Sequence, residues 1–170
     1  NIPMRVTAIT HRKHAIVASY LSQVTPSESS AMKRVAYEPM FFTHLRNTLG
    51  IRGVKRVTLH ERMTALRRIC IITLEKGTPH TEVWRALYGA TSLRADCGKI
   101  CIAVDDDIDP DNSDALFWAI AFRMNPATDL QVLPYRSPGH GPEREHEAAR
   151  EDATLLMDAT MKEELPPLAL

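Results

Sequence analysis

The sequence predicts an α/β fold in which helices pack on a mostly parallel or mixed sheet. Apolar runs bounded by turn signals predict strands, and segments with helical periodicity lie between them. Strands that alternate with helices are typical of crossover connections between parallel strands. The 170 residues suit one domain, and the 44% of hydrophobic and 25% of charged residues are ordinary for a globular protein.

Strands are expected where short apolar or alternating runs occur. Met4–Thr10 and Val54–His60 alternate between apolar and polar residues, which predicts half-exposed strands. Ala65–Leu74 and Ile100–Val104 contain continuous apolar runs, which predict buried strand segments. Further extended pieces are expected at Leu130–Leu133 and Thr154–Asp158, on either side of a mobile surface loop over Ser137–Arg150.

The first helix is predicted from its start and stop signals. Thr25 can cap it, Pro26 suits its first position, and Glu28 completes a capping box. Gly50 is a suitable residue to end it. Pro39 lies inside this run and is expected to kink or split the helix.

Two further helices follow. One should open at Thr78 or His80, after a turn over Lys76–Pro79, and present one apolar face. The other should span Asp114–Met124, with Asn112 or Ser113 as its cap. The core-facing residues of this last helix are expected to be Leu116, Phe117, Ile120 and Ala121.

Composition excludes several classes of function. Lys plus Arg equals Asp plus Glu, at 21 each, so no charge excess indicates a nucleic-acid partner. No apolar run approaches the roughly 20 residues of a membrane span. The odd number of cysteines favours free thiols in a reducing cytoplasm, where we expect the protein to act. Because the chain lacks both an initiator Met and a signal pattern, we expect it to be a piece of a longer protein.

Three adjacent carboxylates follow the Ile100–Val104 run, at Asp105, Asp106 and Asp107. Hard oxygen ligands of this kind could chelate Mg²⁺ or Mn²⁺. Successive side chains diverge, however, so three adjacent acids do not converge on one ion. The favoured interpretation is therefore structural: the acids lie near the start of the next helix, and Arg123 is a plausible salt-bridge partner.

No catalytic set can be assembled from these residues alone. Neither a nucleophile elbow nor a glycine-rich phosphate loop is present, and the seven histidines are scattered. His140 has glycine neighbours but is more simply a turn residue. Arg94 and Lys99 bracket the entry to the Ile100 strand and could meet a phosphate, although solvent-facing charges are the default interpretation.

An ordered set of short segments resembles the C-terminal region of the UbiD family of reversible decarboxylases that use prenylated FMN. The segments are Val6–Arg12 (VTAITHR), Ser22–Ser30 (SQVTPSESS), Val104–Pro110 (VDDDIDP), Trp118-Ala119, Arg123, Leu133–Tyr135 (LPY) and Asp158–Thr160 (DAT). The resemblance implies that the full-length protein binds prenylated FMN with Mn²⁺ and K⁺. It also implies that the Glu-Arg-Glu catalytic network lies in a preceding flavin-binding domain.

The resemblance therefore implies no catalytic residue, no metal ligand and no cofactor bound by this segment alone. Arg94, or alternatively Lys99, would contact the flavin in the full-length enzyme. The substrate pocket would be lined by Leu21 or Val24 and by Leu130 and Val132. The substrate would be an aromatic or α,β-unsaturated carboxylic acid, and the enzyme a homo-oligomer.

Three parts are expected within the chain. Residues 1–30 would link it to the preceding domain, residues 31–136 would form the α/β domain, and residues 137–170 would form a mobile loop and an extension. The segment would act as the substrate-side lid and assembly domain. Two alternatives remain: a non-catalytic assembly subunit or interaction domain, and a free-standing flavodoxin-like domain. The second is disfavoured, because a flavodoxin-like domain needs a phosphate loop after its first strand, and the residues after Thr10 include no glycine to form one.

Overall fold

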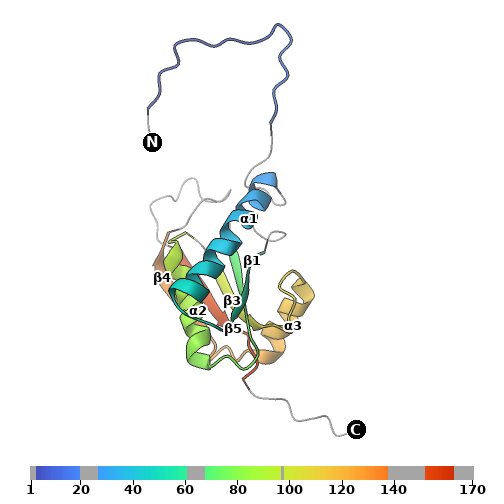
Figure 1. Cartoon of the computed structure of the whole chain (residues 1–170), viewed down its shortest axis with the longest axis vertical. Helices are drawn as coiled ribbons and strands as arrows, with labels where there is room; N and C mark the ends of the chain where they lie inside the picture. Colours follow the sequence, from blue (N-terminus) through green and yellow to red (C-terminus); the bar gives the residue numbers. More distant parts are fainter. Residues whose placement is uncertain (1–2, 20–26, 61–67, 97, 138–151, 163–170) are drawn as a thin grey trace.

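The computed structural model describes residues 3–19, 27–60, 68–96, 98–137 and 152–162. Within them, five strands form one sheet in the order β1-β2-β3-β5-β4 (Figure 1). The strands are β1 (Val54–Leu59), β2 (Ile69–Leu74), β3 (Ile100–Asp105), β4 (Leu130–Arg136) and β5 (Asp152–Asp158). The inner strands β2, β3 and β5 run parallel, and the edge strands β1 and β4 are antiparallel to their neighbours. The predicted mixed sheet is confirmed.

Helices cover the two faces of the sheet unequally. The helices α1 (Glu28–Thr43), the π-helical η1 (His44–Thr48) and α2 (His80–Leu93) share one apolar core with one face. The helix α3 (Ser113–Arg123) packs on the other face, on the right in Figure 1. Side chains alternate between these cores along each strand, so that Cys70 and Ile72 join the first and Ile71 joins the second.

The start of α1 differs from the prediction, whereas its end agrees. Ser27 is the N-cap, and its hydroxyl accepts the N–H of Ser30 at 3.3 Å. Thr25, the predicted cap, lies outside the described residues. Pro39 does not split the helix, because α1 continues to Thr43 and then passes into η1. Gly50 follows with a φ of +71°, as the predicted stop requires.

Two predictions about strands are wrong. Met4–Thr10 forms no strand: residues 3–19 are extended and exposed, and Met4 is 86% exposed. An alternating sequence forms a strand only where another strand supplies hydrogen-bond partners. Strand β1 was expected to be half-exposed, yet Val57, Thr58 and Leu59 are all buried. Val57 and Leu59 lie in the core that the sheet shares with α1 and α2.

The interior face of α3 also differs from the prediction. Asn112 caps the helix as expected, accepting the N–H groups of Asp114 and Ala115. Leu116 and Ala119 are buried, but Phe117 is 61% exposed and Ala121 is exposed. The apolar residues of α3 cover a wider part of the helix surface than the part that contacts the sheet, so the helical period alone predicts too many buried residues.

Strand β5 lies inside the sheet, between β3 and β4. It confirms the extended piece predicted at Thr154–Asp158, and it adds part of residues 137–170, which were expected to be a loop and an extension, to the sheet. The predicted loop over 137–150 falls almost wholly outside the described residues. No helix in the described ranges combines the length and apolarity needed to cross a membrane.

Gly89 marks the closest approach between α2 and the end of η1. A Cβ added there would lie 2.5 Å from Leu49 Cδ1 and 2.9 Å from Leu45 Cδ2. We expect Gly89→Val to lower the free energy of unfolding by about 2 kcal/mol through overpacking. Ala36→Val, on an exposed position of α1, should cost only about 0.5 kcal/mol. Urea denaturation of both variants checks the prediction, and equal costs would contradict it.

Candidate functional site

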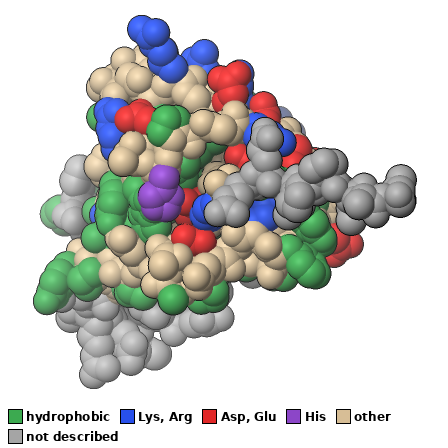
Figure 2. All heavy atoms as spheres, turned by 90° about the horizontal axis from the view of Figure 1, so that it is seen from below, with side chains coloured by type: hydrophobic (Ala, Val, Ile, Leu, Met, Phe, Trp, Pro, Cys, Tyr) green, Lys and Arg blue, Asp and Glu red, His purple; other side chains and the backbone are tan. Residues whose placement is uncertain are grey.

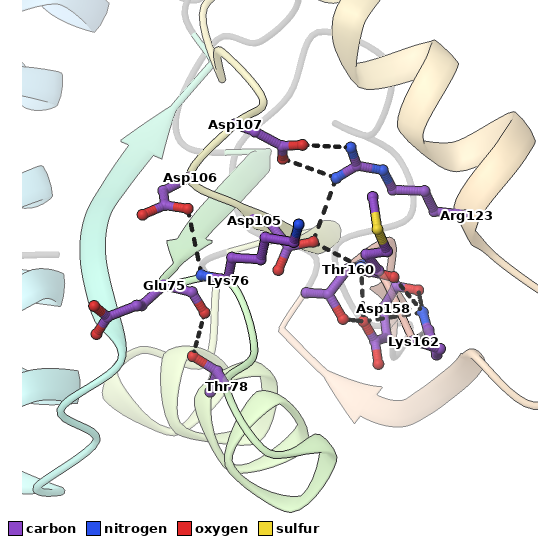
Figure 3. A network of polar contacts seen from close by, with 11 residues as sticks. Glu75, Lys76, Thr78, Asp105, Asp106, Asp107, Arg123, Asp158, Thr160 and Lys162 are labelled. Carbon is purple, nitrogen blue, oxygen red and sulfur yellow. Dashed lines mark hydrogen bonds and ion pairs between the residues drawn. The ribbon is translucent and has the colours of Figure 1, made fainter. Parts of the chain in front are cut away.

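A polar network joins the carboxyl ends of β3 and β5 to the end of α3 (Figure 3). The guanidinium of Arg123 donates to both carboxylate oxygens of Asp107, at 2.9 and 2.6 Å, and to Asp105 Oδ2 at 3.3 Å. Asp105 Oδ2 also accepts the N–H of Met161 at 2.6 Å. The side chains of Arg123 and Asp105 are 7% and 3% exposed, so this ion pair is almost dry.

A second group of contacts centres on Asp158, which is fully buried. Its Oδ1 accepts the N–H of Thr160 at 3.0 Å and the Thr160 hydroxyl at 2.6 Å. The ammonium of Lys162 lies 3.2 Å from carboxylate oxygens of both Asp158 and Asp129. Lys162 also donates to the backbone carbonyls of Asp158 and Thr160. The segment after β5 is therefore held by charge as well as by backbone bonds.

His80 extends this group to the first residue of α2. Its Nδ1 lies 3.2 Å from Asp158 Oδ2, although the angle is not that of a hydrogen bond. The Trp84 indole N–H donates to His80 Nε2 at 3.0 Å, which requires an unprotonated Nε2. The molecule seen from below shows a histidine beside acidic and basic side chains, with apolar side chains around them (Figure 2).

The environment shifts the pKa values of three of these carboxyls. Burial raises the pKa of Asp105 above its usual range, although Met161 and Arg123 oppose that effect. The hydrogen bonds from Arg123 lower the pKa of Asp107. Burial opposes ionisation of Asp129, but bonds from the Asn125 N–H, Thr128 and Lys162 outweigh it and lower its pKa.

These contacts confirm the predicted ion pair between Arg123 and the aspartates, and the pair forms at the end of α3 and not at its start. Arg123 is the predicted salt-bridge partner, and Asp109 Oδ1 accepts the N–H of Asp111 in the loop before α3. In the part of the chain that the structure describes, no group of three or more His, Cys, Asp or Glu is placed to hold a metal ion. Sequence reasoning missed Lys162 and Asp129, because nothing local to either predicts that they meet. The Asp-x-Thr spacing of Asp158 and Thr160 could have indicated the turn.

The predicted cofactor residues Arg94 and Lys99 lie near the amino end of β3, opposite the aspartates. Arg94 donates to Asp96 at 3.0 Å and to the Tyr37 hydroxyl at 3.1 Å, with its guanidinium over the Tyr37 ring. Lys99 lies 3.4 Å from Asp152. Neither residue lines either of the two surface hollows described, of about 400 and 440 Å³. In the described part of the chain, each of these two cations is thus held by a neighbouring carboxylate.

The predicted substrate residues of β4 lie on the α3 side of the sheet. Register places Val132 beside Leu155, Leu155 beside Ile100, and Ile100 beside Ile69. We call these four residues the apolar row. Three of them are partly buried, and Val132 is 61% exposed. Leu130 lies one row further along, beside the buried Met157, and is itself partly buried. Leu21 and Val24 lie outside the described residues.

The apolar row is only partly covered: Ile69, Ile100 and Leu155 pack at the edge of the core under α3, and Val132 is exposed. Residues that pack against α3, such as Ile102 and Val104, lie toward the carboxyl ends of the strands and are buried. Beyond Val132 the strand is irregular: pairing shifts between Leu133 and Arg136, and Tyr135 has a φ of +61°. A positive φ is strained for a tyrosine, and such strain occurs often at functional sites.

The structure defines an α/β domain with a mixed five-stranded sheet and a buried polar network at the carboxyl ends of β3 and β5. The family model described as the C-terminal domain of 3-octaprenyl-4-hydroxybenzoate carboxy-lyase matches residues 30–158. The chain therefore belongs to this UbiD C-terminal domain family, as the resemblance predicted. Proteins of the UbiD class are carboxy-lyases.

Solved structures share the fold. The UbiD-class enzyme HmfF from Pelotomaculum thermopropionicum, in complex with FMN, has a TM-score of 0.67 at 21% identity, over 82% of this chain and 30% of that one. A 3,4-dihydroxybenzoic acid decarboxylase from Enterobacter cloacae has a TM-score of 0.67 at 18% identity, over 83% of this chain and 32% of that one.

Curated relatives are also longer than this chain. An uncharacterised protein of Archaeoglobus fulgidus is 27% identical over 139 residues, which are 76% of this chain and 26% of that protein. A phenolic acid decarboxylase of Escherichia coli O157:H7 is 43% identical over 49 residues, which are 26% of this chain and 10% of that enzyme. The chain thus spans about a third or less of the proteins that it matches.

Loss of Arg123 should be costly, because it leaves the buried Asp105 carboxylate unpaired. We expect Arg123→Gln to lower the free energy of unfolding by about 3 kcal/mol. Lys55→Gln removes an exposed pair with Glu75 and should cost no more than about 0.5 kcal/mol. Urea denaturation at pH 7 compares them, and similar losses would show that the buried pair is not a main stabilising contact.

Asp129 and Asp105 should affect the pH dependence of stability in opposite ways. The folded pKa of Asp129 is lowered, so its contribution is present above the ordinary value of 3.8 and is lost as pH falls through the folded pKa. The folded pKa of Asp105 is raised, so protonation of Asp105 favours the folded state as pH falls toward 3.8.

Asp129→Asn should therefore flatten the loss of stability in acid below about pH 4, whereas Asp105→Asn should steepen the decline between pH 7 and 4. Urea midpoints measured from pH 7 to 3 test both slopes. Parallel profiles for the two variants and the unaltered chain would refute the assignment.

Proposed function

We propose that this chain is the C-terminal domain of a decarboxylase that acts reversibly and without net oxidation on an aromatic or α,β-unsaturated carboxylic acid. Family membership supports carboxy-lyase chemistry, and two similar structures are complexes with FMN and with prenylated FMN. On this proposal, the full-length protein uses prenylated FMN, with Mn²⁺ and K⁺ held outside this segment. When bound, the prenylated flavin supplies an electrophilic carbon that stabilises the negative charge left by CO₂.

The open apolar row is the observation that carries the proposed lid function. Ile69, Ile100 and Leu155 are only partly buried and Val132 is exposed, and apolar surface left in water costs free energy unless another surface covers it. An aromatic acid bound between this row and a preceding domain would remove that surface from water. The row would then exclude water from the reacting carboxylate and position the ring, as a closing domain does in other enzymes. Val132 is the most exposed of its four residues.

Names of relatives favour a phenolic acid among the possible substrates. Solved structures that share the fold include decarboxylases of 3,4-dihydroxybenzoic acid and vanillic acid, and the enzyme from Escherichia coli is a phenolic acid decarboxylase. Each of these acids carries a hydroxyl group on its aromatic ring. We therefore propose an aromatic acid with a ring hydroxyl as the substrate class to test first.

The proposed division of the chain retains residues 1–30 as the link to the preceding domain. Residues 3–19 lie away from the sheet and expose Val6, Ile9, Ile16 and Val17 by 61–100%. Apolar side chains on an extended segment suit packing against a partner domain. Arg94 and Lys99, which are 38% and 44% exposed, could contact the flavin only with the exposed part of each ion pair. We also propose that the full-length protein acts in the cytoplasm and forms a homo-oligomer.

A non-catalytic assembly subunit is the second candidate. The exposed aromatic side chains on α3 favour it, because Phe117, Trp118 and Phe122 are 61, 45 and 75% exposed. Such a patch is typical of a surface that contacts another protein.

Enzymatic assay of the full-length protein separates the two candidates. We expect co-expression with a flavin prenyltransferase to give a flavin absorption spectrum, and CO₂ release from some members of a panel of aromatic acids. An assembly subunit would show neither a flavin spectrum nor turnover. That result would end the decarboxylase proposal.

Val132→Trp should change the range of substrates in the full-length enzyme, because an indole at this exposed position would fill space next to the row. We expect kcat/KM for bulky acids to fall at least tenfold relative to small ones, with flavin absorption unchanged. Val35→Trp, at an exposed position of α1, is the matched control and should leave the ratio unaltered. An unchanged substrate profile for Val132→Trp would remove Val132 from the pocket.

A further inference from the structure

Tyr135 combines three properties that its role in the fold does not explain. It is a tyrosine with a φ of +61°, its side chain is 78% exposed, and it lies in an interruption of the β4–β5 pairing. In the described ranges it is the only non-glycine residue with a positive φ. Its backbone conformation is strained, and its exposed ring offers little burial in return.

Register shows what the interruption does to the side chain. Leu133 pairs with Thr154 and Arg136 pairs with Asp152, so Pro134 and Tyr135 together face Ala153 alone. Thr154 and Asp152 share the face of Leu156, which belongs to the α2 core. Ala153 therefore points to the opposite face, with Leu155. The bulge sets two residues against Ala153, so Tyr135 lies next to the residue whose side chain shares the face of Val132.

Arg136 holds the bulge in place. Its guanidinium donates to the carbonyls of Thr91 and Arg94 at the end of α2, at 2.7 and 2.9 Å, and to the Thr154 hydroxyl at 3.3 Å. These bonds require Arg136 to lie on the α2 side. In regular alternation Arg136 would face the other way, and Tyr135 would face α2. The anchor thus holds the bulge, and with it the positive φ and the exposed ring of Tyr135.

We propose that Tyr135 is a specificity-determining residue that recognises the ring hydroxyl of an aromatic acid bound against the apolar row. This inference rests on the proposed function and deepens it. Tyr135 lies three residues beyond Val132, within about 10 Å along the strand. Its ring can pack against the substrate ring, and its hydroxyl can donate or accept one hydrogen bond. Val132 and Pro134, the exposed neighbours of Tyr135 in β4 that alternate onto this face, are apolar and cannot discriminate a hydroxyl.

The test compares two acids that differ only in a ring hydroxyl, 4-hydroxybenzoic acid and benzoic acid, with the full-length protein. We expect Tyr135→Phe to lower the preference for the hydroxylated acid about tenfold, measured as the ratio of kcat/KM values, and to leave values for benzoic acid unchanged. Tyr88→Phe is the control, because its hydroxyl bonds Gln131 on the opposite face of the sheet. An unchanged ratio for Tyr135→Phe, or an equal change in Tyr88→Phe, would overturn the proposal.

A second variant tests whether the strain serves recognition. Tyr135→Gly removes the Cβ that disfavours a positive φ, so Tm should stay the same or rise, while the preference for the hydroxyl is lost. A fall in Tm of more than about 3 °C would show that Tyr135 is a structural residue instead.

Binding distinguishes failure of this inference from failure of the proposed function. If no acid releases CO₂, calorimetric titration of 4-hydroxybenzoic acid still compares the unaltered protein with Tyr135→Phe. Weaker binding to the variant would support recognition by Tyr135 without decarboxylation. Equal binding, or none to either protein, would reject it.

Discussion

The ion pair between Arg123 and Asp105 is the contact on which the arrangement of this domain depends. One carboxylate oxygen of Asp105 accepts both the guanidinium of Arg123 and the N–H of Met161. It therefore joins the end of β3, the end of α3 and the segment after β5. With both side chains almost fully buried, breaking one bond would leave a charge in a dry environment. This cost keeps α3 over the carboxyl half of its sheet face.

Local signals predicted much of the fold. Asn112 and Gly50 mark helix ends through side-chain capping and a positive φ, and both effects depend on a few neighbouring residues. Burial of the Ile100–Asp105 strand follows equally from its own composition. The position of β5 between β3 and β4 is different, because it depends on pairing with strands distant in sequence. The exposure of Phe117 likewise depends on which row of α3 the sheet touches.

The same distinction applies to the candidate site. The charge of Arg123 and its place one helix beyond the aspartates were enough to predict their ion pair. The family resemblance, and not the local pattern, pointed to Leu130 and Val132, and the register places both on one face of β4. The bulge at Pro134 and Tyr135 could not be predicted, since it is a mismatch in residue number between β4 and β5. Lys162 was missed for a similar reason: its partners Asp129 and Asp158 come from two different strand ends.

The buried ion pairs and the exposed apolar surface lie at opposite ends of the sheet. The carboxyl ends hold the buried carboxylates with Arg123 and Lys162. The amino half of the α3 side holds the apolar row and the strained Tyr135. A domain selected for stability alone would be expected to cover that row and relax that bulge, because each costs free energy. Both costs fall on one surface, and both are lowered if a substrate and a second domain cover it. Binding of a partner therefore explains this face better than the stability of the isolated domain does.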